Sequence, residues 1–325
     1  MHSIFVSLAV TFLPALLTVL PAHAAEDSYP SRTIRWIVPY PPGGTTDFVV
    51  RLVQNRLQTQ LGQPFLIENR AGATGAIGAE AVARSAPDGY TLMYTPGTDM
   101  TLRQYIMKAN PVDAIKDFSP ISASVLSSSI IVAHPSMPFS NAREFVDYAR
   151  KNPGKLNYGS PGVGSNFHLA GEFLKMHGIE ITHVPYKGGG PALAAVIAGE
   201  TNLALNDFTT MLPMIREGRA RAIALIDAKR HPAMPDVPAM GELLPGYSMP
   251  ESWFAFFGPA GMSQPIVMRL NAEIAKAFQA PDVKPRIDER SLIVITGKPE
   301  EITGYLRAGL DVYGKIIKAA GIKPE

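Results

Sequence analysis

Two spacings of apolar residues alternate along the chain, and each change of spacing marks a predicted element. Residues 34–38 form a short apolar run rich in β-branched side chains, the pattern of a buried strand. In residues 48–61 the apolar positions recur every three or four residues, which predicts an amphipathic helix. The segment 39–47 between them holds three prolines and two glycines. It therefore predicts a loop that leads from a strand into a helix N-terminus.

The same order of strand, glycine-rich loop and helix follows again. Residues 65–69 and 90–94 are predicted strands, residues 71–78 are a glycine-rich loop, and a helix is expected to reach about residue 85. Successive units of this kind predict right-handed crossovers and parallel strands. Their loops would then meet at the carboxyl ends of the strands, where ligands of open α/β sheets bind.

A second series begins after the run 125–132, which three serines interrupt and where we expect a crossing between domains. Its predicted helices are 141–150, 166–177 and 191–198, and its predicted strands are 155–159, 179–184, 201–206 and 221–226. Five prolines between residues 232 and 250 mark an irregular return path. The predicted elements 253–257, 264–279, 292–295 and 299–320 then close the chain.

Two α/β halves joined by more than one crossing predict a clamshell, in which each lobe is a sheet flanked by helices and the ligand cleft lies between the lobes. We expect residues 25–125 plus 248–325 to form lobe 1, and residues 126–247 to form lobe 2. This shape suits a binding protein better than an enzyme built on one sheet.

The N-terminal segment predicts export. Residues 4–20 are apolar apart from Ser and Thr, and Ala22-His23-Ala24 has the small-x-small form of a signal-peptidase site. A membrane anchor is the alternative, but Pro14 and the short span favour a signal peptide, residues 1–24, that is cleaved after about Ala24. A periplasmic protein is therefore expected, and other proteins would have to form the pore if it serves transport.

The amino-acid composition limits the kinds of partner and site that we expect for this protein. The chain of 325 residues is 46% apolar, which suits two ordinary cores. Its net charge is +2, from 30 basic and 28 acidic residues without a basic block, so nucleic acid is not expected as a partner. The absence of Cys excludes a lipid-anchored lipoprotein, a disulfide framework and thiolate metal sites.

Loops rich in Gly, Ser and Thr precede helices in both halves. Their hydroxyls and backbone amides can hold a carboxylate without Lys or Arg, although helix capping alone is the alternative for each residue. Tyr40, Phe167 and Phe208 could form apolar walls or belong to an ordinary core. The remaining candidates on this reasoning are Gly44, Thr45, Thr46, Thr74, Gly75, Thr98, Ser160, Gly164 and Ser165.

Two acidic residues in these loops leave their role open. Asp47 and Asp207 could each be a helix cap, meet a ligand amine or bind an ordered water. A carboxylate beside a bound carboxylate is unfavourable unless it is neutralised or turned away, so neither is expected to contact an anionic group directly.

Patterns typical of catalysis and metal binding are missing from the sequence. Tyr158 stands where a nucleophile elbow at Ser160 needs glycine, and Phe167 stands where a dinucleotide fingerprint needs its third glycine. His168 and Glu172 share a helix face but lack a third converging ligand. No cofactor or metal is expected. The remaining alternatives are an exported α/β hydrolase or isomerase acting on a small carboxylate, and a sensor with the same fold and ligand.

The chain resembles the Bug-type extracytoplasmic solute receptors of tripartite tricarboxylate transporters, from Tyr29 to about Gly321. The matching motifs are spread along the whole sequence, which makes the resemblance specific. They are residues 37–47 (IVPYPPGGTTD), 68–70 (ENR), 86–91 (APDGYT), 152–160 (NPGKLNYGS), 183–188 (HVPYKG) and 257–261 (FGPAG).

The resemblance implies a type II-like, two-lobed periplasmic binding protein that closes on a small carboxylate and delivers it to the permease subunits. It implies that the loops matching Tyr40–Asp47 and Ala73–Gly75 hold one ligand carboxylate, partly through water. The loops matching Ser160–Ser165 and Asn206–Phe208 would set ligand choice, which adds Ala73, Val163 and Asn206 to the candidates. A monomer is expected.

Several residues depart from the family pattern and leave the ligand open. Tyr40 stands where the family usually has Phe, Ala71 replaces a usual Pro, and Thr74 replaces a usual Gly. Asp99 puts a negative charge near the expected cleft. Dicarboxylates, tricarboxylates and aromatic acids such as terephthalate or nicotinate all remain candidates.

Overall fold

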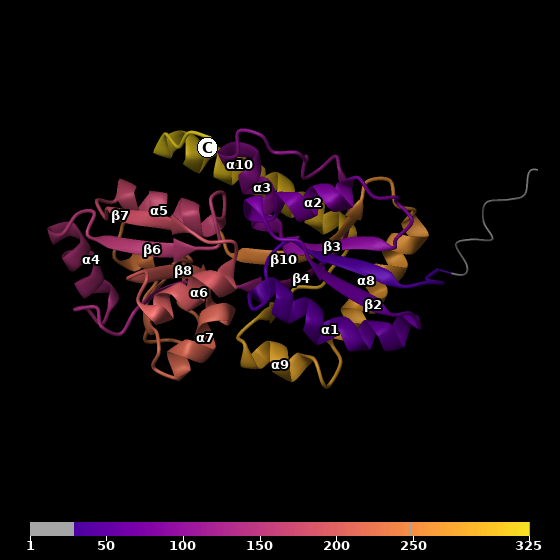
Figure 1. Cartoon of the computed structure of the whole chain (residues 1–325), viewed down its shortest axis with the longest axis horizontal. Helices are drawn as coiled ribbons and strands as arrows, with labels where there is room; N and C mark the ends of the chain where they lie inside the picture. The colour runs from indigo at the N-terminus through magenta and orange to yellow at the C-terminus, as the bar shows by residue number, and fades with distance from the viewer. Residues whose placement is uncertain (1–28, 248, 325) are drawn as a thin grey trace, which may run out of the picture.

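The computed structural model describes residues 29–247 and 249–324 of the chain. They form two α/β lobes that lie side by side, each a mixed sheet flanked by helices (Figure 1). The predicted signal peptide, residues 1–24, lies outside the described residues. None of the helices within the described ranges combines the length and hydropathy that crossing a membrane would require.

Lobe 1 contains a six-stranded sheet in the order β11-β4-β10-β3-β1-β2 among the described residues. β1 is parallel to β2 and β3, as the strand–loop–helix units predict, whereas β10 is antiparallel to β3 and β4. The strands are β1 (Ile34–Val38), β2 (Phe65–Asn69), β3 (Thr91–Pro96), β4 (Phe118–Ser127), β10 (Ser252–Pro259) and β11 (Ile293–Val294). The helices are α1 (Thr45–Leu61), the 3-10 turn η2 (Ala73–Gly75), α2 (Ala76–Ala83), α3 (Gly97–Ile106), α8 (Gln264–Phe278), α9 (Lys284–Glu289) and α10 (Pro299–Ala320).

The strand β1 is apolar on both faces because helices cover both faces of its sheet. Ile34, Trp36 and Val38 pack in one core with side chains of α1 and α8. Ile37 points to the other face, into a core that includes residues of α2 and α10. A parallel strand buried on both sides needs apolar side chains on both faces, and in β1 Arg35, which pairs with Glu68, is the exception.

Lobe 2 contains a five-stranded sheet in the order β7-β6-β8-β5-β9 among the described residues. β6 is parallel to β7 and β8, whereas β5 is antiparallel to β8 and β9. The strands are β5 (Ser129–Ala133), β6 (Leu156–Ser160), β7 (Ile181–Pro185), β8 (Leu203–Asp207) and β9 (Arg221–Leu225). The helices are α4 (Ala142–Lys151), α5 (Asn166–Met176), α6 (Gly189–Ala198), α7 (Phe208–Arg216) and the 3-10 turn η3 (Met240–Glu242).

The chain crosses between the lobes at the serines that interrupt the 125–132 run. β4 ends at Ser127 in lobe 1 and β5 begins at Ser129 in lobe 2, so the predicted crossing is confirmed. The Ser129 amide donates to the buried carboxylate of Asp227 at 3.0 Å, and its hydroxyl lies 3.5 Å from that of Ser252, where β10 begins. The outgoing and returning crossings therefore lie together. The residue limits given for the lobes stay a prediction, and the limit after residue 125 falls inside β4.

The C-terminal helix α10 connects the two lobes a third time (Figure 1). It packs on α3 and β4 of lobe 1, and its buried Tyr313 belongs to the core of lobe 2. The Tyr313 hydroxyl donates to the side-chain oxygen of Asn166 at 3.3 Å, at the start of α5. The last helix thus ties the position of lobe 2 to the sheet of lobe 1.

The predicted elements match the structure best where one face of a helix is polar. The helix expected over residues 299–320 has these limits, whereas α1 begins at Thr45 rather than at residue 48. The helices α3, α7 and α9 were not predicted. Most of α3 and the first five residues of α7 are buried, so these segments lack the polar face that marks an amphipathic helix.

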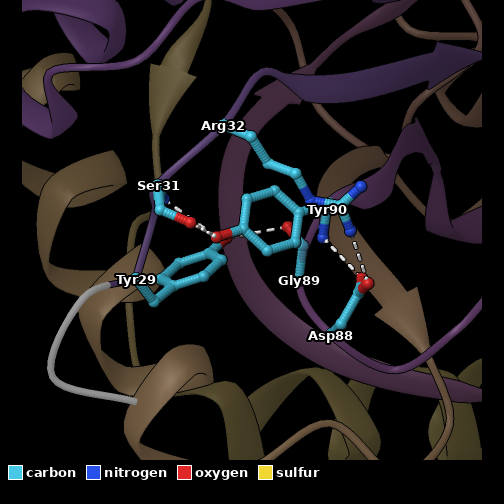
Figure 2. Close-up of polar contacts among 6 residues, drawn as sticks. All are labelled: Tyr29, Ser31, Arg32, Asp88, Gly89 and Tyr90. Carbon is cyan, nitrogen blue, oxygen red and sulfur yellow. Dashed lines mark hydrogen bonds and ion pairs between the residues drawn. The ribbon is translucent and has the colours of Figure 1, made fainter. Parts of the chain in front are cut away.

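Hydrogen bonds and an ion pair hold the first described residues against the turn that precedes β3 (Figure 2). The Tyr29 hydroxyl donates to the Gly89 carbonyl at 2.7 Å, and the Ser31 amide donates to the Tyr90 hydroxyl at 2.9 Å. Arg32 pairs with Asp88 at 2.8 Å and covers the Tyr90 ring at 4.2 Å. These contacts fix the entry to β1 at the end of lobe 1 that faces away from lobe 2 (Figure 1).

Gly97 at the start of α3 generates a stability prediction. A Cβ there would lie 2.0 Å from the ring of Trp253, so Gly97→Ala must displace a large side chain in the core. We expect a loss of about 1–3 kcal/mol in the free energy of unfolding, measured by urea denaturation. Gly304→Ala is the control, because nothing lies within 4 Å of a Cβ on this exposed glycine of α10. The free energy of unfolding of the control should rise by up to about 1 kcal/mol. Equal changes in both variants would contradict the packing of Gly97 against Trp253.

Candidate functional site

A small cavity of about 30 Å³ lies between the two lobes. Its walls come from the loops at the strand ends of both sheets. The lining residues are Tyr40, Pro41, Gly44, Thr45, Thr46, Pro96, Thr98, Asp99, Pro161, Phe167, Gly189, Asn206, Asp207, Thr210, Ser252 and Phe254.

Five helices begin at this cavity. The first turns or N-caps of α1 and α3 from lobe 1, and of α5, α6 and α7 from lobe 2, all contribute lining residues. A helix N-terminus carries amide groups without intrahelical partners and a partial positive charge. Because five such ends converge, the cavity favours a negatively charged group of a ligand. None of the described residues that line it is Lys, Arg or His.

Direct contacts between the lobes surround the cavity. The hydroxyls of Thr45 and Thr210 lie 3.1 Å apart across it. The backbone amide of Asn166 in lobe 2 donates to the carboxylate of Asp99 in lobe 1 at 3.2 Å. The Thr74 hydroxyl donates to the carbonyl of Val163 at the outer edge. The structure therefore has its lobes in contact around the cavity.

Asp99 is part of a buried polar group in lobe 1. The Tyr40 hydroxyl donates to its carboxylate at 2.6 Å. Arg103, only 1% exposed, lies beside this pair and donates to the carbonyls of Asp99 and Thr74 at 3.1 Å each. Burial raises the pKa of the Asp99 carboxyl, whereas the Tyr40 hydrogen bond and the Arg103 charge act in the opposite direction. Tyr40 and Asp99 thus form one hydrogen-bonded unit.

Asp207 at the end of β8 is buried with fewer partners. It is the N-cap residue of α7, yet its side chain accepts no capping hydrogen bond from that helix. Its Oδ1 atom has no hydrogen-bond partner among the described residues, and the residue is 9% exposed. Burial, followed by the nearby charge of Asp99, raises the pKa of the Asp207 carboxyl to about 8.

Asp47 has a structural role outside the cavity. Its carboxylate accepts hydrogen bonds from Arg51 at 2.9 Å, from Asn69 at 3.0 Å and from the Gly43 amide at 3.3 Å. These contacts hold the proline-glycine loop against α1 and β2. Asp47 lines an open outer hollow together with Arg51, Arg286 and Arg290, rather than the cavity between the lobes.

The predicted ligand-binding residues fall into two groups. Those that line the cavity are Tyr40, Gly44, Thr45, Thr46, Thr98, Phe167, Asn206 and Asp207. Those outside its lining are Asp47, Ala73, Thr74, Gly75, Ser160, Val163, Gly164, Ser165 and Phe208. Ligand contact by any of these residues stays a prediction.

The second group supports the walls of the cavity. Ser165 is the N-cap of α5, where its hydroxyl accepts a hydrogen bond from the His168 amide at 3.2 Å. Phe208 packs in the core of lobe 2 against the ring of His231. Ala73, Thr74 and Val163 line a separate hollow at the outer edge of the lobe contact.

The sequence reasoning did not select half of the lining. Asp99 was noted only as a charge near the cleft, although its place in the first turn of a helix after a strand is the same signal that marked Thr45 and Thr46. Thr210 and Gly189 also occupy first turns of helices. The proline and β10 positions carry no local signal of this kind. These missed residues are Pro41, Pro96, Asp99, Pro161, Gly189, Thr210, Ser252 and Phe254.

One serine and histidine pair occurs near the cavity. The Ser160 hydroxyl lies 2.6 Å from His183 Nε2, and His183 stacks on the ring of His168. Ser160 is fully buried and does not line the cavity, and burial lowers the pKa of His183 to about 3. Within residues 29–247 and 249–324, no group of three His, Asp or Glu side chains could hold a metal ion. Glu172 instead pairs with Lys175.

The raised pKa of Asp207 generates a prediction for the ligand-free protein. Between about pH 4, the pKa of an unfolded Asp, and pH 8, the folded state binds a proton that the unfolded state has lost, so stability falls as the pH rises. Asp207→Asn removes this loss, because an amide stays neutral. Relative to the wild type, we expect the free energy of unfolding of the variant to rise by up to about 1.4 kcal/mol for each pH unit in this window. Urea denaturation of both proteins at pH 5 and pH 8 measures this difference. An identical pH dependence in both proteins would contradict the assigned environment of Asp207.

Comparison with known proteins agrees with the fold and the resemblance. The family described as the tripartite tricarboxylate transporter family receptor matches residues 49–322. The chain is 31% identical over 308 residues to BugT of Bordetella pertussis, covering 94% of each chain. It is also similar to the solved structure of the periplasmic binding protein BugD, with 28% identity, a TM-score of 0.87, and coverage of 91% of this chain and 100% of BugD. A protein of R. palustris solved with adipate has 31% identity, a TM-score of 0.87, and the same coverage. The chain belongs to the receptor family of the tripartite tricarboxylate transporters, and its two-lobed fold is that of the periplasmic binding proteins.

Proposed function

We propose that this protein is a periplasmic receptor that captures a small carboxylate between its lobes and delivers it unchanged to the permease of a tripartite tricarboxylate transporter. The ligand classes that we consider are dicarboxylates, tricarboxylates and aromatic acids. The adipate bound to the R. palustris neighbour is a ligand of the first class.

The observation that carries this proposal is the convergence of five helix N-termini on a cavity without a cationic side chain. Neutral amides and hydroxyls bind an anion by charge-assisted hydrogen bonds, yet they form no fixed ion pair that would have to be broken on release. Such a site suits reversible capture and transfer.

Lobe closure would couple ligand binding to the shape of the receptor. Gly44 and Thr46 belong to lobe 1, whereas Asn206 and Thr210 belong to lobe 2, so only an arrangement with the lobes in contact presents both sets to one ligand. A ligand that binds both sets stabilises the closed state relative to the open one. The adjacent crossings near Ser129 and Ser252 are the proposed hinge.

An exported hydrolase or isomerase is the competing proposal. The Ser160–His183 pair is the arrangement in the described residues that resembles a nucleophile and its base. Ser160 is fully buried outside the cavity lining and cannot reach a ligand there without rearrangement. This geometry favours binding without catalysis.

We also propose that residues 1–24 are removed after about Ala24 on export and that the receptor acts as a monomer. Residues 25–125 plus 248–325 and residues 126–247 are the proposed lobes. Mass spectrometry of the periplasmic fraction tests the cleavage site, and light scattering tests the monomer.

Thr46 provides a test of the carboxylate site. We expect Thr46→Ala to weaken binding of the best carboxylate by about 5- to 10-fold, which is the effect of one lost hydrogen bond. Calorimetric titration measures the affinity. Thr59→Ala is the matched control, because Thr59 lies on the exposed face of the same helix.

The ligand itself is found by thermal-shift screening of the purified protein against a carboxylate panel, followed by a turnover assay on each hit. Stabilisation without product formation is the expected result. Conversion of any hit to product would favour the enzyme proposal, and an unchanged affinity of Thr46→Ala would remove α1 from the site.

A further inference from the structure

The charges around the cavity do not suit a simple carboxylate ligand. Two carboxyl side chains, Asp99 and Asp207, line the cavity, and no Lys, Arg or His side chain is among the described residues that line it. Helix N-termini can hold one carboxylate of a ligand. A second anionic group on the ligand would lie close to Asp99 and would keep the Asp207 carboxyl protonated, because like charges in a small buried space repel strongly.

Asp99 is satisfied by the protein itself. One of its oxygens accepts the Tyr40 hydroxyl at 2.6 Å, and the other accepts the Asn166 amide at 3.2 Å. The buried guanidinium of Arg103 lies beside it and donates to its backbone carbonyl. Hydrogen bonds and a neighbouring positive charge stabilise the ionised form, so Asp99 does not need a ligand to balance it.

Asp207 has weaker support, because the hydroxyls of Thr45 and Ser127 interact with its carboxyl group but no cationic side chain among the described residues lines the cavity beside it. Its Oδ1 has no hydrogen-bond partner among the described residues, and its side chain does not cap the helix that it begins. The backbone amide of Asp207 is bound to the Asn206 side chain at 2.9 Å, which fixes the main chain at the cavity wall. A rigidly placed, 91% buried carboxyl group with an unused acceptor is unfavourable unless a ligand supplies the donor.

We propose that Asp207 is a specificity-determining residue that accepts hydrogen bonds from a protonated nitrogen of the ligand. The preferred ligand then carries an ammonium group as well as a carboxylate. This inference rests on the carboxylate-receptor function proposed above and refines its ligand class. The N-terminus of α1 in lobe 1 binds the carboxylate and Asp207 in lobe 2 binds the ammonium, so a zwitterionic ligand complements both lobes.

The titration of Asp207 gives this proposal a second readout. Burial and the nearby charges of Asp99 and Asp227 together raise the pKa of its carboxyl to about 8, although hydrogen bonds from Thr45 and Ser127 act in the opposite direction. The free receptor therefore holds a proton on Asp207 at pH 7. An ammonium ligand stabilises the ionised carboxylate and releases that proton, whereas a second ligand carboxylate would keep the proton bound.

The experiment compares acids that differ only by an amino group. Calorimetric titrations at pH 7 use the pairs succinate and aspartate, adipate and 2-aminoadipate, and 3-methylbenzoate and 3-(aminomethyl)benzoate. We expect the aminated member of at least one pair to bind at least 10-fold more tightly than its partner. Repeating that titration in buffers of different ionisation enthalpy should show net proton release.

Asp207→Asn should reduce the preference of that pair to within about 2-fold, because an amide cannot balance an ammonium charge. Asp147→Asn, an exposed acid on α4 of the same lobe, is the control and should keep the preference. Proton release by the wild type is measured without any variant, so the test survives a variant that fails to fold.

Two results would overturn the inference. If the unaminated acids bind as tightly as their partners, or binding takes up protons, Asp207 does not select an ammonium, while the carboxylate-receptor function stands. If neither member of any pair binds, the carboxylate-receptor function fails and this inference fails with it.

Discussion

The convergence of helix N-termini is the constraint on which the rest of the structure depends. Among the described residues, the N-terminal ends of five helices, two in lobe 1 and three in lobe 2, meet at one cavity, and each end carries a partial positive charge. Parallel strands followed by helices produce this arrangement in each lobe, because all their loops leave at the carboxyl edge of the sheet. Two such edges facing each other form the proposed anion site, which is lined by no cationic side chain among the described residues.

The connections between the lobes keep these two edges opposed. The adjacent crossings at Ser129 and Ser252 are the proposed hinge, while α10 packs on both lobes. Hydrogen bonds such as that from the Asn166 amide to Asp99 bridge the lobes only when they are in contact. In the proposed function, ligand binding and lobe contact draw on the same residues, which would couple the shape of the receptor to its cargo.

The two acids at the cavity wall differ in how the protein balances them. Tyr40 and Asp99 bond to each other beside the buried Arg103. That unit balances Asp99 internally and leaves Asp207 as the acid with an unused acceptor. The charge of the site thus comes from how these residues pair, rather than from how many acids line the cavity.

The local elements and their order were decided by the sequence itself, because strand and helix patterns depend on neighbouring residues. The run 34–38, the helix 299–320 and the crossing at the serines match the structure for this reason. Tertiary structure alone decided which side chains reach the cavity. Tyr40 and Asp99 are 59 residues apart, and Thr45 meets Thr210 across the lobes, so no local pattern contains either contact. The buried helices α3 and α7 were missed for a related reason: a segment covered on most sides lacks the polar face that makes a helix recognisable, and only the packed fold reveals it.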